Sequence, residues 1–281
     1  MHGVRQRSTE GGRRGSRLAK LLKYAAVGKV TIRNHLAYVT DFFIRSIFLI
    51  IILYIFIQLW NTTFRGEGTE LIAGYSFEQI IWYLIFAESF VIACPSLSTK
   101  IEEEVKSGDI GYKLARPVSY LWFHYAGYMS EVFIRMPINL AVGGMLGILV
   151  LGPPGFGWGW PGFLLVSVGA FTINFLLNMM LALCAFWVEE TRGLEFVYHK
   201  FLFTVGGMLM PLELFPQVLQ KVCAWLPFQA IVYFAARTAV SFDAEAMWRM
   251  LGTQAFWIAG LGAALMFIYR KGVSKLHVNG G

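Results

Sequence analysis

The chain has 281 residues, of which 57% are hydrophobic, 16% aromatic and only 15% charged, and its formal net charge is +7. A soluble domain carries about 25% charged residues, and its apolar residues form short periodic stripes rather than the long blocks of this sequence. The composition therefore excludes an ordinary water-soluble domain and predicts an all-α polytopic membrane protein. The basic residues adjoin the apolar blocks, which indicates membrane topology rather than nucleic-acid binding.

The first 40 residues are expected to lie outside the bilayer. Residues 1–16 are rich in Gly, Arg and Ser and have no apolar periodicity, so we expect them to be disordered. Residues 17–40 mix apolar and basic side chains, as in an amphipathic helix that lies on an anionic membrane surface. No small-residue cleavage pattern follows the first apolar block, which favours a retained cytoplasmic tail.

Six apolar segments within residues 41–271 are predicted to span the membrane, since a hydrocarbon core of roughly 30 Å needs about 20 helical residues. These segments are 42–60, 77–97, 121–151, 163–188, 196–210 and 250–269. The third segment is longer than a perpendicular crossing requires, and Pro137 within it offers a natural kink.

The distribution of Lys and Arg predicts the orientation. Most basic residues lie in the N-terminal region, in the charged segment 98–119 and in the tail 272–281, whereas the loops 61–76 and 152–162 together hold only Arg65. By the positive-inside rule, both termini and the segment 98–119 are cytoplasmic, and the two loops are external.

The stretch 211–240 is a different kind of segment. It is amphipathic, it contains Glu213, Lys221 and Arg237 among aromatic residues, and Pro216 and Pro227 interrupt it. Broken backbone in a membrane needs protein or water around it, so a lipid-facing span is unsuitable here. We expect one or two short re-entrant or interfacial helices on the external side.

Patterns that carry chemistry are missing from the sequence. No phosphate-binding loop occurs, and the spelling Gly157-x-Gly159-x-x-Gly162 falls between two predicted spans without a βαβ context. The histidines and the three cysteines are scattered and form no metal or redox motif. We expect no enzymatic activity, no metal and no bound cofactor.

Polar residues within the predicted spans have two interpretations. Glu131 and Arg135 lie four residues apart, as do Asp41 and Arg45, which suits intrahelical pairs. Glu88 has no evident local partner, so either it faces a substrate or an ion, or it forms a structural hydrogen bond with another helix or subunit. Three asparagines are expected to form interhelical hydrogen bonds: Asn139, Asn174 and Asn178.

Two segments together resemble a known family. The first reads KSGDI at 106–110 and LARPVS at 114–119, and the second reads GGMLMPLELFPQVLQKVCAWLPFQ at 206–229. Both resemble segments of type-2 ABC exporter permeases, the first being similar to a cytoplasmic loop of the form "GxI…L.RPVS". The resemblance covers nearly the whole chain, from about residue 18 to residue 269.

The resemblance implies the permease subunit of an ATP-driven exporter in the bacterial cytoplasmic (inner) membrane. Its implied partners are a cytoplasmic ABC ATPase dimer, which would bind the ATP, and a second permease that is identical or related. The segment 98–119 would be the part that couples to the ATPase, through Glu102, Glu103, Glu104, Gly108, Asp109, Arg116 and Pro117. Pro211, Pro216 and Pro227 would shape the external hairpin 211–240.

Other interpretations of the same features stay open. The alternative interpretation of the segment 98–119 is a solvated connector, since runs of charged residues are usually exposed to water. A secondary transporter that couples to ions or protons through Glu88 is the alternative function, although the sequence shows no inverted repeat of hydropathy. An intramembrane enzyme would need a cluster of catalytic side chains, which the sequence does not contain. Membrane lipid is an expected partner and nucleic acid is not.

Overall fold

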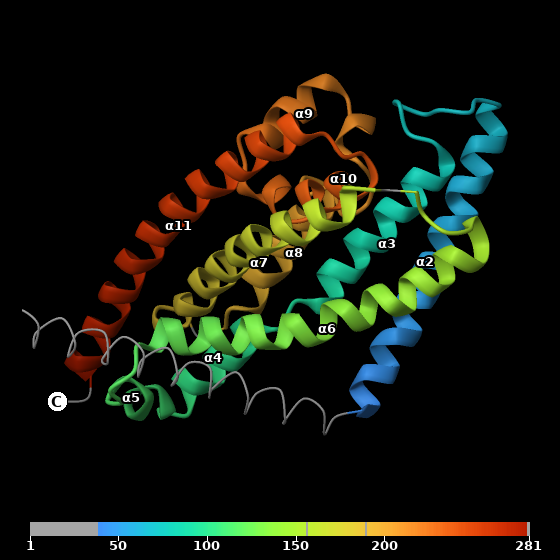
Figure 1. The fold of residues 1–281 in the computed structure, drawn as a ribbon. Helices are drawn as coiled ribbons and strands as arrows, with labels where there is room; N and C mark the ends of the chain where they lie inside the picture. Colours follow the sequence, from blue (N-terminus) through green and yellow to red (C-terminus); the bar gives the residue numbers. More distant parts are fainter. Residues whose placement is uncertain (1–38, 156, 189, 280–281) are drawn as a thin grey trace, which may run out of the picture.

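A computed structural model of the chain describes residues 39–155, 157–188 and 190–279, and these form a bundle of helices (Figure 1). The predicted disordered segment 1–16 and nearly all of the predicted amphipathic helix 17–40 lie outside the described residues. The predicted tail 272–281 is helical as far as Asn279, because the last helix continues past the predicted end of the last span.

In the described ranges, five helical segments are long and apolar enough to cross a membrane. They contain α2 (Val39–Glu67), α3 (Phe77–Ala93) with its continuation α4 (Leu97–Lys106), α6 (Tyr120–Leu151), α7 (Gly159–Leu183) and α11 (Ala244–Asn279). They correspond to the first four predicted spans and the last one. The chain is thus a multi-pass membrane protein by the length and composition of its helices.

The segment predicted as the fifth span differs from the prediction. Its helix, α8 (Arg192–Thr204), has 13 residues and ends at Thr204 rather than at residue 210. Gly207 then takes a φ of +76°, which favours glycine. The carbonyl oxygens of Gly206 and Gly207 accept hydrogen bonds from the Tyr233 amide and the Tyr83 hydroxyl, so tertiary partners hold the turn. A 13-residue helix is shorter than a full crossing, and a sixth span stays a prediction.

Helices α3 and α7 form the centre of the bundle, and α2, α6 and α11 pack around them. The two central helices meet through aromatic rings: Phe90 and Phe171 stack with centroids 3.9 Å apart, and Phe86 lies 4.7 Å from Phe163. On the other side of α3, Gly147 of α6 approaches closely enough that an added Cβ would lie 2.6 Å from the side chain of Ile85. Bulky rings on one side of α3 and glycine on the other thus set its distances from α7 and α6.

The stretch predicted as a broken external element does consist of short helices. They are η2 (Leu212–Leu214), α9 (Gln217–Ala224), η3 (Pro227–Ala230) and α10 (Tyr233–Val240). Pro211 and Pro216 are the N-cap residues of η2 and α9, and Pro227 is the first residue of η3. The three prolines therefore start helices, as their fixed φ and missing N–H allow.

Helix α10 is buried against both α3 and α7. The close approach to α7 depends on Gly159, where an added Cβ would lie 2.2 Å from the carbonyl oxygen of Ala239. On the other side, Arg237 donates to Glu213 at 2.9 Å, and the Tyr233 hydroxyl donates to the same carboxylate oxygen at 2.5 Å. These contacts connect α10 to η2, the short helix that precedes α9.

The two ends of the bundle differ in character. At one end, α4 and α5 (Asp109–Leu114) lie with the start of α2 and the end of α11, and at the other end lie α9 and the loop after α2 (Figure 1). Helix α11 begins at the second end, where Asp243 accepts a hydrogen bond from the Ala246 amide at 3.1 Å. That backbone hydrogen bond lowers the pKa of Asp243 below its usual value.

Candidate functional site

The segment predicted to be cytoplasmic, 98–119, consists mainly of two short helices, α4 and α5. Both Ile101 of α4 and Ile110 of α5 are fully buried, and α4 packs against α7. Gly108 between the two helices has a φ of +78°, and nothing lies within 4 Å of an added Cβ. The bend therefore requires glycine for its backbone conformation and not for lack of space.

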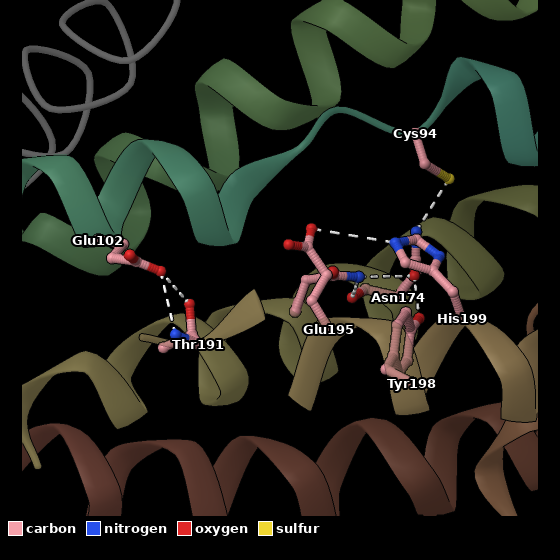
Figure 2. A network of polar contacts seen from close by, with 8 residues as sticks. Cys94, Glu102, Asn174, Thr191, Glu195, Tyr198 and His199 are labelled. Carbon is pink, nitrogen blue, oxygen red and sulfur yellow. Dashed lines mark hydrogen bonds and ion pairs between the residues drawn. The ribbon is translucent and has the colours of Figure 1, made fainter. Parts of the chain in front are cut away.

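The carboxylate of Glu102 joins α4 to the start of α8. One oxygen accepts from the Thr191 amide at 3.1 Å and from the Thr191 hydroxyl at 2.5 Å, as Figure 2 shows. The other oxygen lies 2.6 Å from the ammonium of Lys106, one helical turn further along α4. Since Thr191 is 1% exposed, this contact is a buried link between the two polar segments at this end of the bundle.

The carboxylate of Glu104 joins α4 to α5 and to the start of α6. One oxygen lies 2.5 Å from the ammonium of Lys113. The other accepts a hydrogen bond from the Tyr120 hydroxyl at 2.9 Å and lies 3.3 Å from Nε2 of His124. Because Glu104 is 5% exposed, its carboxylate interacts with these side chains of the same chain rather than with solvent. Together, Glu102 and Glu104 fix α4 and α5 to α6 and to the start of α8.

The opposite face of the same segment is open to solvent. Glu103, Asp109 and Arg116 are exposed, and so are Gly108 and Pro117. The ring of Tyr112 is 70% exposed, and the guanidinium of Arg116 lies 4.8 Å from its centroid. Exposed tyrosine and arginine side chains are the residue types that most often dominate protein–protein contacts. We call the exposed side chains of Glu103, Asp109, Tyr112 and Arg116 the α4–α5 face.

A second polar cluster lies beside the break between α3 and α4. The amide nitrogen of Asn174 donates to the Tyr128 hydroxyl at 2.8 Å and lies 2.9 Å from the sulfur of Cys94. Its oxygen accepts from Tyr198 of α8, as Figure 2 shows, and it also accepts from Asn178. The side chain of Asn174 therefore connects the α3–α4 break, α6, α7 and α8 by hydrogen bonds.

Several predicted polar contacts are confirmed. Asn139 of α6 donates to the carbonyl of Ser89 in α3 at 3.2 Å, and Asn174 bonds across helices. Asn178 donates to Asn174 of its own helix, and its side chain also interacts with the hydroxyl of Tyr198 in α8. Glu131 and Arg135 form the predicted ion pair. The proposed partner of Arg45, Asp41, has a side chain outside the described part of the chain.

Glu88 lies deep in the bundle. It is 1% exposed, in the middle of α3, and its Oε1 has no hydrogen-bond partner in the described structure. A buried carboxyl group without an ionic partner is costly to ionise. Its position separates it from α4 and α5, so the structure does not bring it together with the other predicted site residues.

The seven residues predicted to couple to an ATPase thus fall into two groups. Glu102 and Glu104 point into the chain, whereas Glu103, Gly108, Asp109, Arg116 and Pro117 are exposed. Sequence reasoning missed Tyr112 of the exposed face and the internal partner Thr191. The pattern at 102–104 held a usable signal for this division. Three consecutive residues of a helix span about 200°, so the three acids cannot all lie on one face.

Within the described ranges, no group of three or more His, Cys, Asp or Glu side chains is arranged to bind an ion. What the site offers is a rigidly attached polar segment with an exposed face.

A family model for ABC-2 family transporter proteins matches residues 47–280, which is most of the chain and includes both polar segments. The chain belongs to the ABC-2 transporter family. No curated protein gives a significant match. Membership makes the chain a membrane component of an ABC transporter, which pairs with an ATP-binding cassette component.

Proposed function

We propose that this ABC-2 protein is the permease subunit of an ATP-driven exporter and that it couples to a separate cytoplasmic ATPase through the segment 98–119. The observation that carries the proposal is the two-sided build of α4 and α5. The buried carboxylates of Glu102 and Glu104 hold them to α6 and to the start of α8, while the side chains of the α4–α5 face are exposed. A partner that moves this face would move those helices as a rigid body.

The rest of the proposal follows from that role. Two such chains, identical or related, form the translocation path, and an ATPase dimer binds all the ATP, so this chain has no enzymatic activity and no cofactor. Both termini and the α4–α5 face lie on the cytoplasmic side of the bacterial inner membrane, which agrees with the positive-inside rule. Helix α8 then completes a shallow sixth span, and α9 and α10 form the re-entrant hairpin that closes the external end.

The test is reconstitution with the ATPase encoded next to this gene. The wild-type chain should co-purify with that ATPase and change its rate of ATP hydrolysis. Arg116→Ala and Tyr112→Ala should weaken this association without lowering the thermal stability of the permease, because both side chains are exposed. The matched control is Arg249→Ala, which removes an exposed arginine of α11 that pairs with Glu245 one turn away. If Arg116→Ala and Arg249→Ala change the association with the ATPase equally, the assignment of the α4–α5 face is wrong.

A second candidate function rests on Glu88, whose buried carboxyl group has an oxygen without a hydrogen-bond partner. In an ion- or proton-coupled carrier, this group would take up and release a proton during transport. Transport would then survive depletion of ATP, would stop when the membrane potential is collapsed, and would be lost in Glu88→Gln. Transport that stops with ATP depletion and continues in Glu88→Gln would remove this candidate.

A further inference from the structure

Helices α2, α4 and α6 enclose a cavity of about 300 Å³ that neither the α4–α5 face nor Glu88 uses. Arg45 of α2 lines it on one side, Lys100 of α4 on a second, and Glu131 and Arg135 of α6 on a third. Its lining residues come from the start of α2, from the break before α4 and from the first half of α6. The start of α2 and helix α4 lie at the same end of the bundle (Figure 1).

The charges around this cavity favour an anion. Three cationic side chains face one carboxylate, and that carboxylate, Glu131, already pairs with Arg135 on its own helix. Arg45 and Lys100 therefore leave an excess of positive charge on the cavity wall. The predicted pair of Asp41 with Arg45 would offset one of these charges, and Lys100 would still leave the cavity wall positive.

The start of α4 adds to this potential. Ser96 and Leu97, the N-cap and first residue of this ten-residue helix, both line the cavity, and the Ser96 side chain makes no capping hydrogen bond. The first amide groups of a helix point outward along its axis and carry partial positive charge. Backbone N–H groups and two cationic side chains thus converge on one space, which is the usual chemistry of a phosphate site.

The remaining wall is apolar and aromatic, with Pro95, Phe123 and Tyr128 beside Leu97. A site for a small, fully hydrated anion needs no such wall. An anion attached to a hydrocarbon body fits it better, because the cations bind the head and the apolar side chains contact the body. Basic pockets between transmembrane helices on the cytoplasmic side are suited to lipid head groups.

The chain's own N-terminal segment is a poor occupant on grounds of charge. Residues 1–38 contain nine Lys and Arg residues and a single acidic residue, Glu10. A segment of that charge would be repelled by the basic wall. The occupant must bring negative charge from elsewhere, and the membrane leaflet next to the cavity supplies it.

We propose that this cavity binds the phosphate head group of an anionic phospholipid from the cytoplasmic leaflet, with Arg45, Lys100 and the start of α4 contacting the phosphate. The cytoplasmic placement rests on the orientation in the proposed function. The binding itself does not depend on an ATPase, so each proposal can fail without the other.

The test uses the full-length chain, purified and stripped of lipid in a neutral detergent. Thermal unfolding and native mass spectrometry are measured with dioleoyl phosphatidylglycerol, with dioleoyl phosphatidylcholine and with soluble glycerol 3-phosphate. Phosphatidylglycerol should raise the unfolding temperature and remain bound, and the other two should not. Equal binding of phosphatidylcholine would overturn the requirement for negative charge, and equal protection by glycerol 3-phosphate would assign the site to a soluble phosphate instead of a lipid.

Variants then locate the site. Lys100→Gln and Arg45→Gln should each weaken the affinity for phosphatidylglycerol about five-fold, since one basic residue near an anionic surface contributes about 1 kcal/mol. Lys100→Arg, which keeps the charge, should bind nearly as well as wild type and shows that position 100 tolerates change. Lys271→Gln is the matched control, because Lys271 is an exposed lysine near the cytoplasmic end of α11 and does not line the cavity. If Lys100→Gln and Arg45→Gln both bind like Lys271→Gln, the proposed site is wrong.

Discussion

Glu102 offers the sharpest test of how α4 is held, because its partner Thr191 is buried and its neighbour Glu103 is exposed. Glu102→Ala removes the acceptor for the Thr191 amide at 3.1 Å and for the Thr191 hydroxyl at 2.5 Å. Thr191→Val removes only the hydroxyl donor. A hydrogen bond to a charged group contributes roughly 1.5–3 kcal/mol, and part of the carboxylate's charge is already offset by Lys106. We therefore expect a coupling free energy of about 1–2 kcal/mol from the double-mutant cycle.

The cycle is measured as the change in the free energy of unfolding of the purified chain in mixed micelles, followed by circular dichroism. The matched control is Glu103→Ala, the same substitution one residue along the same helix at an exposed position, which should change stability by less than about 0.5 kcal/mol. In the proposed function, Glu103→Ala should instead weaken the association with the ATPase. If Glu102→Ala is no more destabilising than Glu103→Ala, or if the cycle gives no coupling, Glu102 does not hold α4 to α8.

Two glycines give further predictions. Gly108→Ala should lower the stability of the chain by about 1 kcal/mol because φ at this position is +78°, whereas Gly111→Ala, at a helical position with equally open surroundings, should be neutral or slightly stabilising in the same unfolding titration. Gly159→Ala should cost about 1–3 kcal/mol and lower the melting temperature, since its Cβ would lie 2.2 Å from the Ala239 carbonyl oxygen. Gly260→Ala, in α11 with nothing within 4 Å, is its control, and equal melting temperatures for the two variants would contradict the close packing of α10 on α7.

The sequence located most of the helices because the signal for them is local. In lipid, a single segment of about twenty apolar residues can satisfy its backbone hydrogen bonds by itself only as a helix, whatever its neighbours. Five of the six predicted segments are long apolar helices. The prolines at 211, 216 and 227 likewise marked where the stretch is broken, because a proline restricts its own backbone and that of the residue before it. That each of them stands at the start of a short helix came from the structure.

The end of α8 could not be predicted from the sequence of the segment itself. Residues 205–210 are as apolar as a span, yet Gly207 turns the chain because Tyr233 and Tyr83, distant in sequence, bond the carbonyls of the turn. Contacts of that kind depend on the packing of α3 against α10 and leave no pattern in the segment itself.

The sequence by itself determined that this protein spans a membrane, where its broken and charged segments lie, and which family it resembles, since each of these depends on composition or on residues close together in the chain. Only the tertiary structure decided which of three consecutive glutamates face the protein. Glu102 and Glu104 are buried because Thr191, Lys113 and Tyr120 reach them from other helices, and Glu103 is exposed because it lies on the other side of α4. The cavity among Arg45, Lys100 and Arg135 likewise exists only once α2, α4 and α6 pack together, because its basic residues are separated by tens of positions along the chain.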